Sequence, residues 1–131
     1  MGMIEMIENI EKTVFETQVV EVGQDARDFK EIKMAILFGN EAPDALRPSC
    51  YLIHVTPVAT DIKPGMTLVI DNQTYPITAV GNEVQTNLSN LGHIAISFTG
   101  ATKAELPGTL YVADRDYPVI DVDSNIKIVA G

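Results

Sequence analysis

The chain has 131 residues, 46% of them hydrophobic, with no tryptophan and a formal net charge of −9. That length fits one domain, and the apolar content is typical of a globular chain rather than a disordered one. The acidic excess excludes binding to nucleic acid or anionic membranes through a basic patch, and it favours partners that present positive charge.

The cysteine content and the hydropathy pattern are typical of a protein of the cytosol. The single cysteine, Cys50, cannot form an internal disulfide, which fits a reducing cytosol. No apolar stretch approaches the roughly 20 residues that span a bilayer. The N-terminus lacks the basic and apolar segments of a signal peptide. The sequence therefore predicts a cytoplasmic protein that does not itself insert into a membrane.

The chain divides into an N-terminal extension at residues 1–12, either disordered or vector-derived, and a single domain at residues 13–131. Within the domain, residues 13–22 are rich in Val and Thr and predict the first strand. A near-continuous apolar run at residues 33–38 predicts a buried strand. The polar segment between the two strands predicts a helical turn capped by Asp25.

Residues 50–56 form the apolar run with the most unusual composition, because it contains a histidine. Pro48 and Pro57 bracket this run, which predicts a short strand that is covered on both faces. Side chains alternate along a strand, so His54 and Thr56 share one face. A buried imidazole needs hydrogen-bond partners or gives up its charge, and His54 therefore requires an explanation.

Five further strands are expected downstream. They cover residues 66–70, 74–80, 93–98, 109–113 and 126–130. The first two form a hairpin, in which Pro76 marks an edge or a bulge because it cannot donate to a ladder. The total is seven or eight short strands, with no alternating strand–helix series and no visible internal repeat. This pattern predicts an all-β fold, a small closed or partly open barrel.

One short helix is predicted, at residues 82–91. Asn82 and Gln85 have the spacing of a capping box at its start. Three apolar residues fall on one face at helical spacing: Val84, Leu88 and Leu91. Gly92 fits the position just past the end of the helix.

The motifs of several reaction classes are missing. The sequence has no Gly-rich phosphate loop and no GxSxG elbow, and its two histidines and one cysteine lack metal-ligand spacing. We therefore expect no cofactor and no metal. The chemistry that remains is that of imidazole, a good nucleophile near neutral pH. His54 could accept a phosphoryl group, and Thr56 could orient its ring or donate to a phosphate oxygen. His93 could approach from a neighbouring strand. Composition by itself favours the alternative of a structural histidine.

Three segments, taken in order, resemble the glucitol/sorbitol-specific IIA component of the bacterial phosphotransferase system. They are YPITAVG at residues 75–81, NLSNLGH at 87–93 and ELPGTLYV at 105–112. Three upstream segments, at residues 42–43, 50–54 and 63–65, also resemble this family. No single segment is diagnostic, but the ordered set is specific and covers the chain from the first strand to the last.

The resemblance implies a phosphocarrier with a small β-barrel fold. Such a protein takes a phosphoryl group from HPr and passes it to the IIB part of a IIB/IIC permease, without metal or nucleotide. The phosphorylated histidine corresponds to His54, whereas a partner role for His93 is our own inference. Val55 and Thr56 stand where some relatives carry a second histidine. Because the phosphoryl group brings a charge of about −2, acidic side chains are expected to surround the site rather than line it.

Two alternatives remain open at this point. One is a non-catalytic acidic β module that binds a sugar or a protein partner, which the scarcity of catalytic groups favours. The other makes His93 the acceptor and His54 a structural residue. The sequence is compatible with a homo-oligomer and does not indicate which sugar alcohol is served.

Overall fold

The structure, a computed structural model, describes residues 12–130. The predicted extension lies outside the described residues, apart from Lys12, which begins the first strand. The strands are β1 (Lys12–Val22), β2 (Met34–Gly39), β3 (Tyr51–Ile53), β4 (Thr67–Ile70), β5 (Gln73–Val80), β6 (Ile94–Ser97), β7 (Thr109–Val112) and β8 (Asn125–Ala130). The helical segments are the 3-10 helices η1 (Ala26–Ile32) and η2 (Arg47–Ser49) and the α-helix α2 (Val84–Leu91).

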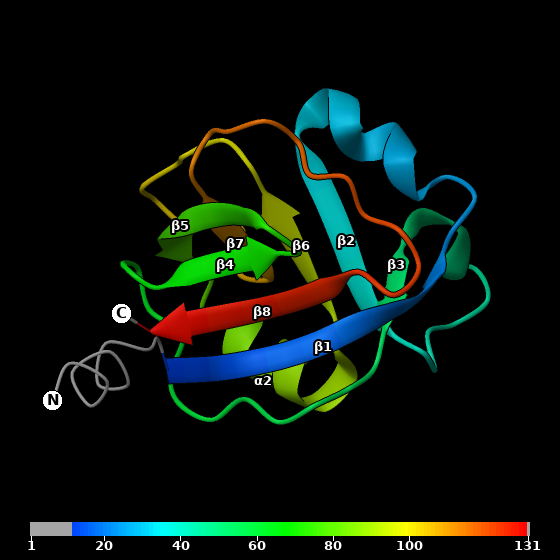
Figure 1. Cartoon of the computed structure of the whole chain (residues 1–131), viewed down its shortest axis with the longest axis horizontal. Helices are drawn as coiled ribbons and strands as arrows, with labels where there is room; N and C mark the ends of the chain where they lie inside the picture. The colour runs from blue at the N-terminus through cyan, green and yellow to red at the C-terminus, as the bar shows by residue number, and fades with distance from the viewer. Residues whose placement is uncertain (1–11, 131) are drawn as a thin grey trace, which may run out of the picture.

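The strands close into a barrel in the order β1-β3-β2-β6-β7-β5-β4-β8 (Figure 1), which confirms the predicted all-β fold. Alternate side chains point inward and form one apolar core. Its fully buried members include Val19, Leu37, Ile53, Ile70, Ile96, Leu110 and Ile126. Each such side chain contributes about 1.5–3 kcal/mol when it leaves water, so the filled interior is the main source of stability. A smaller cluster, which contains Phe38 and Leu52, packs separately from this core.

The barrel contains an internal structural repeat. One four-strand unit occurs twice along the chain, first as β1–β4 and then as β5–β8. In each copy a glycine and then a helical segment follow the first strand, and the second and third strands pair in parallel. The N–H of Gly23 donates to the Cys50 carbonyl, and the N–H of Gly81 donates to the Thr109 carbonyl, both at 2.9 Å. The fold therefore contains an internal repeat that is not visible in the sequence. The sequence hides the repeat because few equivalent positions hold the same residue.

The connections repeat as well. Gly65 and Asp123, 58 positions apart, precede β4 and β8 and both have positive φ (96° and 74°). Their N–H groups donate to the carbonyls of Ile77 and Val19 respectively, which are again 58 positions apart. The correspondence therefore extends over the whole barrel and allows each residue of one copy to be compared with a counterpart in the other.

The turns into β2 and β6 follow the same correspondence. Lys33 and Gly92 both adopt left-handed backbone, with φ of 57° and 65°. The prediction that Gly92 ends the helix is confirmed, because only glycine adopts this conformation without steric cost.

The predicted strand at residues 50–56 is too long. β3 ends at Ile53 because its parallel neighbour β2 ends at Gly39, which pairs with Ile53. Beyond that pair no ladder continues on this side, and the chain leaves the sheet to run to β4 (Figure 1). The expectation that His54 is buried is therefore wrong: the residue is exposed.

The predicted capping box at the start of α2 is also wrong. Glu83 occupies the cap position and makes no side-chain cap bond. The Gln85 carboxamide instead holds the loop before β4, since it accepts from the Ile62 N–H at 2.9 Å and donates to the Thr60 carbonyl at 3.0 Å. Leu91, expected on the buried face, is 49% exposed at the last turn.

The other local expectations are largely met. β4 and β5 pair as a hairpin, in which Thr67 lies opposite Pro76. The irregularity expected at Pro76 lies beside it, between Ile77 and Ala79 in the pairing of β5 with β7. Asp25 precedes η1 as expected, but its side chain makes no cap bond. None of the helices in residues 12–130 has the length and apolar character needed to cross a membrane.

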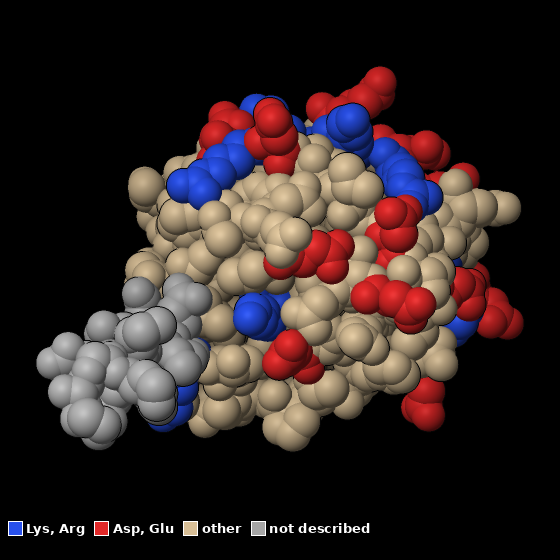
Figure 2. Space-filling model, viewed as in Figure 1, with Lys and Arg blue, Asp and Glu red and all other residues tan. Residues whose placement is uncertain are grey.

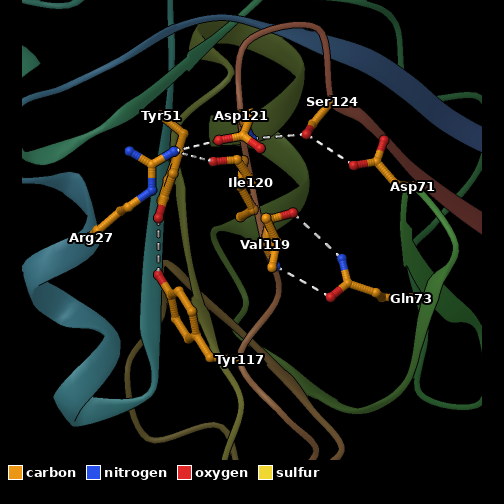
Figure 3. A network of polar contacts seen from close by, with 9 residues as sticks. All are labelled: Arg27, Tyr51, Asp71, Gln73, Tyr117, Val119, Ile120, Asp121 and Ser124. Carbon is orange, nitrogen blue, oxygen red and sulfur yellow. Dashed lines mark hydrogen bonds and ion pairs between the residues drawn. The ribbon is translucent and has the colours of Figure 1, made fainter.

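Polar contacts hold the loop between β7 and β8 against the barrel (Figure 3). Arg27 of η1 donates to the Ile120 carbonyl at 2.8 Å and pairs with Asp121 at 2.7 Å. Gln73, at the start of β5, accepts from the Val119 N–H at 3.2 Å. The Ile120 side chain is buried in the core. Exposed polar contacts contribute little individually, so the buried Ile120 is the main anchor of this loop.

The partly buried hydroxyl of Tyr117, in the same loop, should make the free energy of unfolding depend on pH under alkaline conditions. Its hydroxyl donates to the Met34 carbonyl at 2.9 Å and lies 3.4 Å from the Tyr51 hydroxyl (Figure 3). Burial, and after it the contact with Tyr51, raises the pKa of Tyr117 well above its usual range. Above about pH 10, the unfolded chain therefore binds fewer protons than the native one, and the free energy of unfolding falls as the pH rises.

Urea denaturation between about pH 9 and 11 should show this fall, and Tyr117→Phe should make it shallower. An unchanged slope in the variant would contradict the assignment to Tyr117.

Candidate functional site

The His54 side chain lines a cavity of about 540 Å³ where β2 and β3 end. The other lining residues are Phe38, Gly39, Asn40, Glu41, Val55, Asn90 and Leu91. Two of these residues, Val55 and Leu91, are apolar and 48% and 49% exposed, so the cavity presents apolar surface to solvent. An exposed imidazole at an open cavity can be reached by a group on another protein.

Three segments meet at this cavity: the end of β2, the end of β3 and the last turn of α2. They approach closely because position 39 has no side chain. A Cβ on Gly39 would lie 2.5 Å from the Leu91 carbonyl oxygen and 2.6 Å from Val55 Cγ2. Glycine at this position therefore allows the helix end and the loop after β3 to form one wall.

Hydrogen bonds from two threonine side chains connect the segment around His54 to β1. The Thr17 hydroxyl donates to the His54 carbonyl at 2.7 Å, and the Thr56 hydroxyl donates to the Glu16 carbonyl at 2.9 Å. The segment follows β1 without forming a strand of its own. The sequence predicts that Thr56 orients the imidazole, whereas in the structure its hydroxyl donates to the Glu16 carbonyl.

His93 contacts a wall of the cavity and is not itself among the lining residues. Its ring stacks on Phe38, with centroids 4.1 Å apart and an interplanar angle of 27°. Its Nδ1 lies 3.2 Å from the Leu37 carbonyl, which can only accept, so Nδ1 carries the proton. His93 therefore lies behind Phe38, which lines the same cavity as His54.

The sequence singled out His54 as a candidate site residue but did not predict most of the residues that lie around it. Thr17, on β1, carries no motif and is a buried polar residue that only the fold brings to His54. Glu41 lines the cavity, contrary to the expectation that acidic side chains would only surround it. The Gly39-Asn40 pair was visible as the end of a strand, but its position beside His54 depends on the parallel pairing of β2 with β3.

The charges near the cavity differ from those elsewhere on the protein. On the face shown in Figure 2, Lys and Arg side chains gather mainly along the upper edge, among Asp and Glu. Two of the cations of the protein are paired with acids, in the ion pairs Arg27–Asp121 and Lys33–Asp114. Among the residues that line the cavity, Glu41 is the only acidic one, and none is Lys or Arg. A partner that docks here would therefore meet negative rather than positive charge.

Cys50 does not supply a second nucleophile. It is buried, and its Sγ donates to the Leu46 carbonyl at 3.2 Å. Burial raises the pKa of the thiol above its usual value, which disfavours the reactive thiolate. The described residues also contain no group of three or more His, Cys, Asp or Glu side chains placed to hold a metal ion.

Comparison with known proteins gives one consistent family. The sequence model of the glucitol/sorbitol-specific IIA component of the phosphotransferase system matches residues 14–127. Glucitol/sorbitol-specific EIIA components of Shigella flexneri and of Escherichia coli K12 are each 33% identical over 100 residues, which cover 76% of this chain and 81% of theirs.

A solved structure has the same fold. It is the crystal structure of a phosphotransferase-system IIA component from Enterococcus faecalis V583, which superposes with a TM-score of 0.78. The match covers 88% of this chain and 100% of that chain, at 24% sequence identity.

Proposed function

The chain belongs to the glucitol/sorbitol-specific IIA family of the phosphotransferase system, and from that premise we propose that His54 carries the phosphoryl group. In this proposal HPr is the donor and the IIB part of a glucitol/sorbitol permease is the recipient. Membership of the family supports a phosphocarrier role, and the position of His54 supports its assignment as the acceptor.

The observation that carries the proposal is the exposed imidazole of His54 in an open cavity. His54 is the only histidine among the lining residues. Its nitrogen lone pair forms a new P–N bond while the P–N bond of the donor phosphohistidine breaks, and the donor nitrogen keeps the electron pair of that bond. Because one P–N bond replaces another, the protein needs to supply position rather than energy.

The surroundings of His54 fit a carrier that exchanges with two proteins in turn. Both partners would use the same opening, where the half-exposed Val55 and Leu91 lie. The net charge of −9 and Glu41 at the cavity favour partners with positive charge around their reacting group. We place this exchange in the cytoplasm, in line with the single buried cysteine, and we assign no cofactor to it.

We assign supporting roles to the other two residues that the sequence singled out. His93 acts as a partner through Phe38, since its ring stacks on that wall of the cavity. Thr56 acts as an orienter of the loop, through its bond to the Glu16 carbonyl.

Intact-mass spectrometry tests the proposal. The protein is incubated with phosphoenolpyruvate, enzyme I and HPr and kept at neutral or alkaline pH. We expect a gain of one phosphoryl mass (~80 Da) that acid removes, since phosphohistidine is acid-labile. If active HPr produces no gain, the proposal is wrong, and the alternative of an acidic β module that acts by binding a sugar or a protein would replace it.

A further inference from the structure

The His54 carbonyl is held by a side chain of β1. The residue directly follows β3 and lies outside the strand. Its carbonyl accepts from the Thr17 hydroxyl at 2.7 Å. Thr17 is 4% exposed and sits on β1 opposite Ile126, in the regular pairing with β8. A hydroxyl on the rigid barrel wall therefore holds the backbone of the exposed histidine.

In the second copy of the repeat, a hydroxyl from the first strand also holds the loop after the third strand, at a position three residues further along. Tyr75, 58 positions after Thr17, sits on β5, and its hydroxyl donates to the Asp116 carbonyl at 2.7 Å. Asp116 lies in the loop after β7, as His54 lies in the loop after β3. The residue that corresponds to His54 there is Ala113, directly after the last residue of β7. In both copies, a hydroxyl from the first strand holds the loop that follows the third strand.

Resting on the proposed function, we propose that Thr17 is a positioning residue for phosphoryl transfer to His54. By holding the His54 carbonyl, it fixes the backbone from which the imidazole projects into the cavity. Transfer between two imidazoles requires the attacking nitrogen to lie in line with the breaking bond, so backbone freedom at His54 lowers the rate. Thr56, two residues on, still ties the loop to β1 when Thr17 changes, and the effect is therefore local.

Three variants test this role. Thr17→Val keeps the shape of the side chain and removes the hydroxyl, Thr17→Ser keeps the hydroxyl, and Tyr75→Phe removes the equivalent hydroxyl from the copy without a histidine. The measurements are thermal melts and the single-turnover rate of labelling by phospho-HPr over a range of its concentrations. Thr17→Val and Tyr75→Phe should lower the melting temperature by similar amounts, because each removes one buried hydrogen bond.

Only Thr17→Val should slow labelling, on the order of tenfold, through the maximal rate rather than the half-saturating concentration of phospho-HPr. Thr17→Ser should restore the rate. A wild-type rate in Thr17→Val, or equal slowing in Tyr75→Phe, would overturn the proposal. If Thr17→Val does not fold, Thr17→Ala is compared with Tyr75→Phe by the same criterion. Absence of labelling in the wild-type protein would instead overturn the proposed function, and this inference with it.

Discussion

Replacement of His54 by glutamine is expected to abolish phosphoryl uptake and leave the fold intact. Glutamine has no nucleophilic nitrogen, because its amide lone pair is delocalised, and no other histidine lines the cavity. Since His54 is exposed, its loss removes no core packing, and stability should change by about 0.5 kcal/mol or less. Intact mass after incubation with phospho-HPr should show no acid-labile gain, while the melting temperature stays near that of the wild type.

The variant His93→Gln is expected to show the opposite combination of stability and labelling to His54→Gln. The His93 ring is half-buried against Phe38 and bonded to the Leu37 carbonyl, so this variant should lose stability and still accept the phosphoryl group. The reverse result, with labelling lost in His93→Gln and kept in His54→Gln, would make His93 the acceptor. It would also revive the alternative in which His54 is structural.

The largest expected loss of stability follows from Gly23→Ala or Gly81→Ala. A Cβ on Gly23 would lie 2.6 Å from the Pro48 carbonyl carbon, and one on Gly81 would lie 2.6 Å from that of Pro107. These neighbours are backbone atoms, which cannot rotate away as a flexible side chain would. Each substitution should therefore separate the first strand of its copy from the segment before the third strand. We expect a loss of about 3 kcal/mol, or ~10 °C in melting temperature.

Gly108→Ala is the matched control. A Cβ on Gly108 would have no atom nearer than the Asn87 side chain at 3.9 Å, and its counterpart in the first copy of the repeat is Ser49, which already carries a side chain. Chemical denaturation of the three variants should separate Gly108→Ala, near the wild type, from the other two. Equal stability of all three would mean that the two glycines do not mark obligatory close approaches.

The fold was predictable because its strands are short, apolar and separated by clear breaks. β1, β2, β4, β5, β6, β7 and β8 lie within a residue or two of their predicted ranges. The error at residues 50–56 has a tertiary cause, since β3 ends where the neighbouring β2 ends. The error at Gln85 has a similar cause, because its side chain binds the loop before β4 instead of capping its own helix.

Of the residues at the candidate site, the sequence identified His54 but few of the residues that surround it. His54 could be singled out because a histidine in an apolar run requires an explanation and because the run resembles that of the IIA family. Thr17 and Phe38 could not, since a threonine in a strand and an aromatic residue at a strand end are ordinary. Only the fold distinguishes them, since Thr17 contacts His54 and Phe38 contacts His93 across sequence separations of 37 and 55 positions.

By itself, the sequence determined the fold class and the family and singled out His54 as the candidate acceptor, because apolar periodicity and short motifs are local properties of the chain. The tertiary structure alone decided that His54 is exposed, that Glu41 joins its cavity and that a hydroxyl on β1 holds its backbone. It also revealed the repeat, in which equivalent backbone hydrogen bonds are made by different side chains. Strand pairing depends on backbone geometry, which many sequences satisfy, so the symmetry persists where residue identity does not.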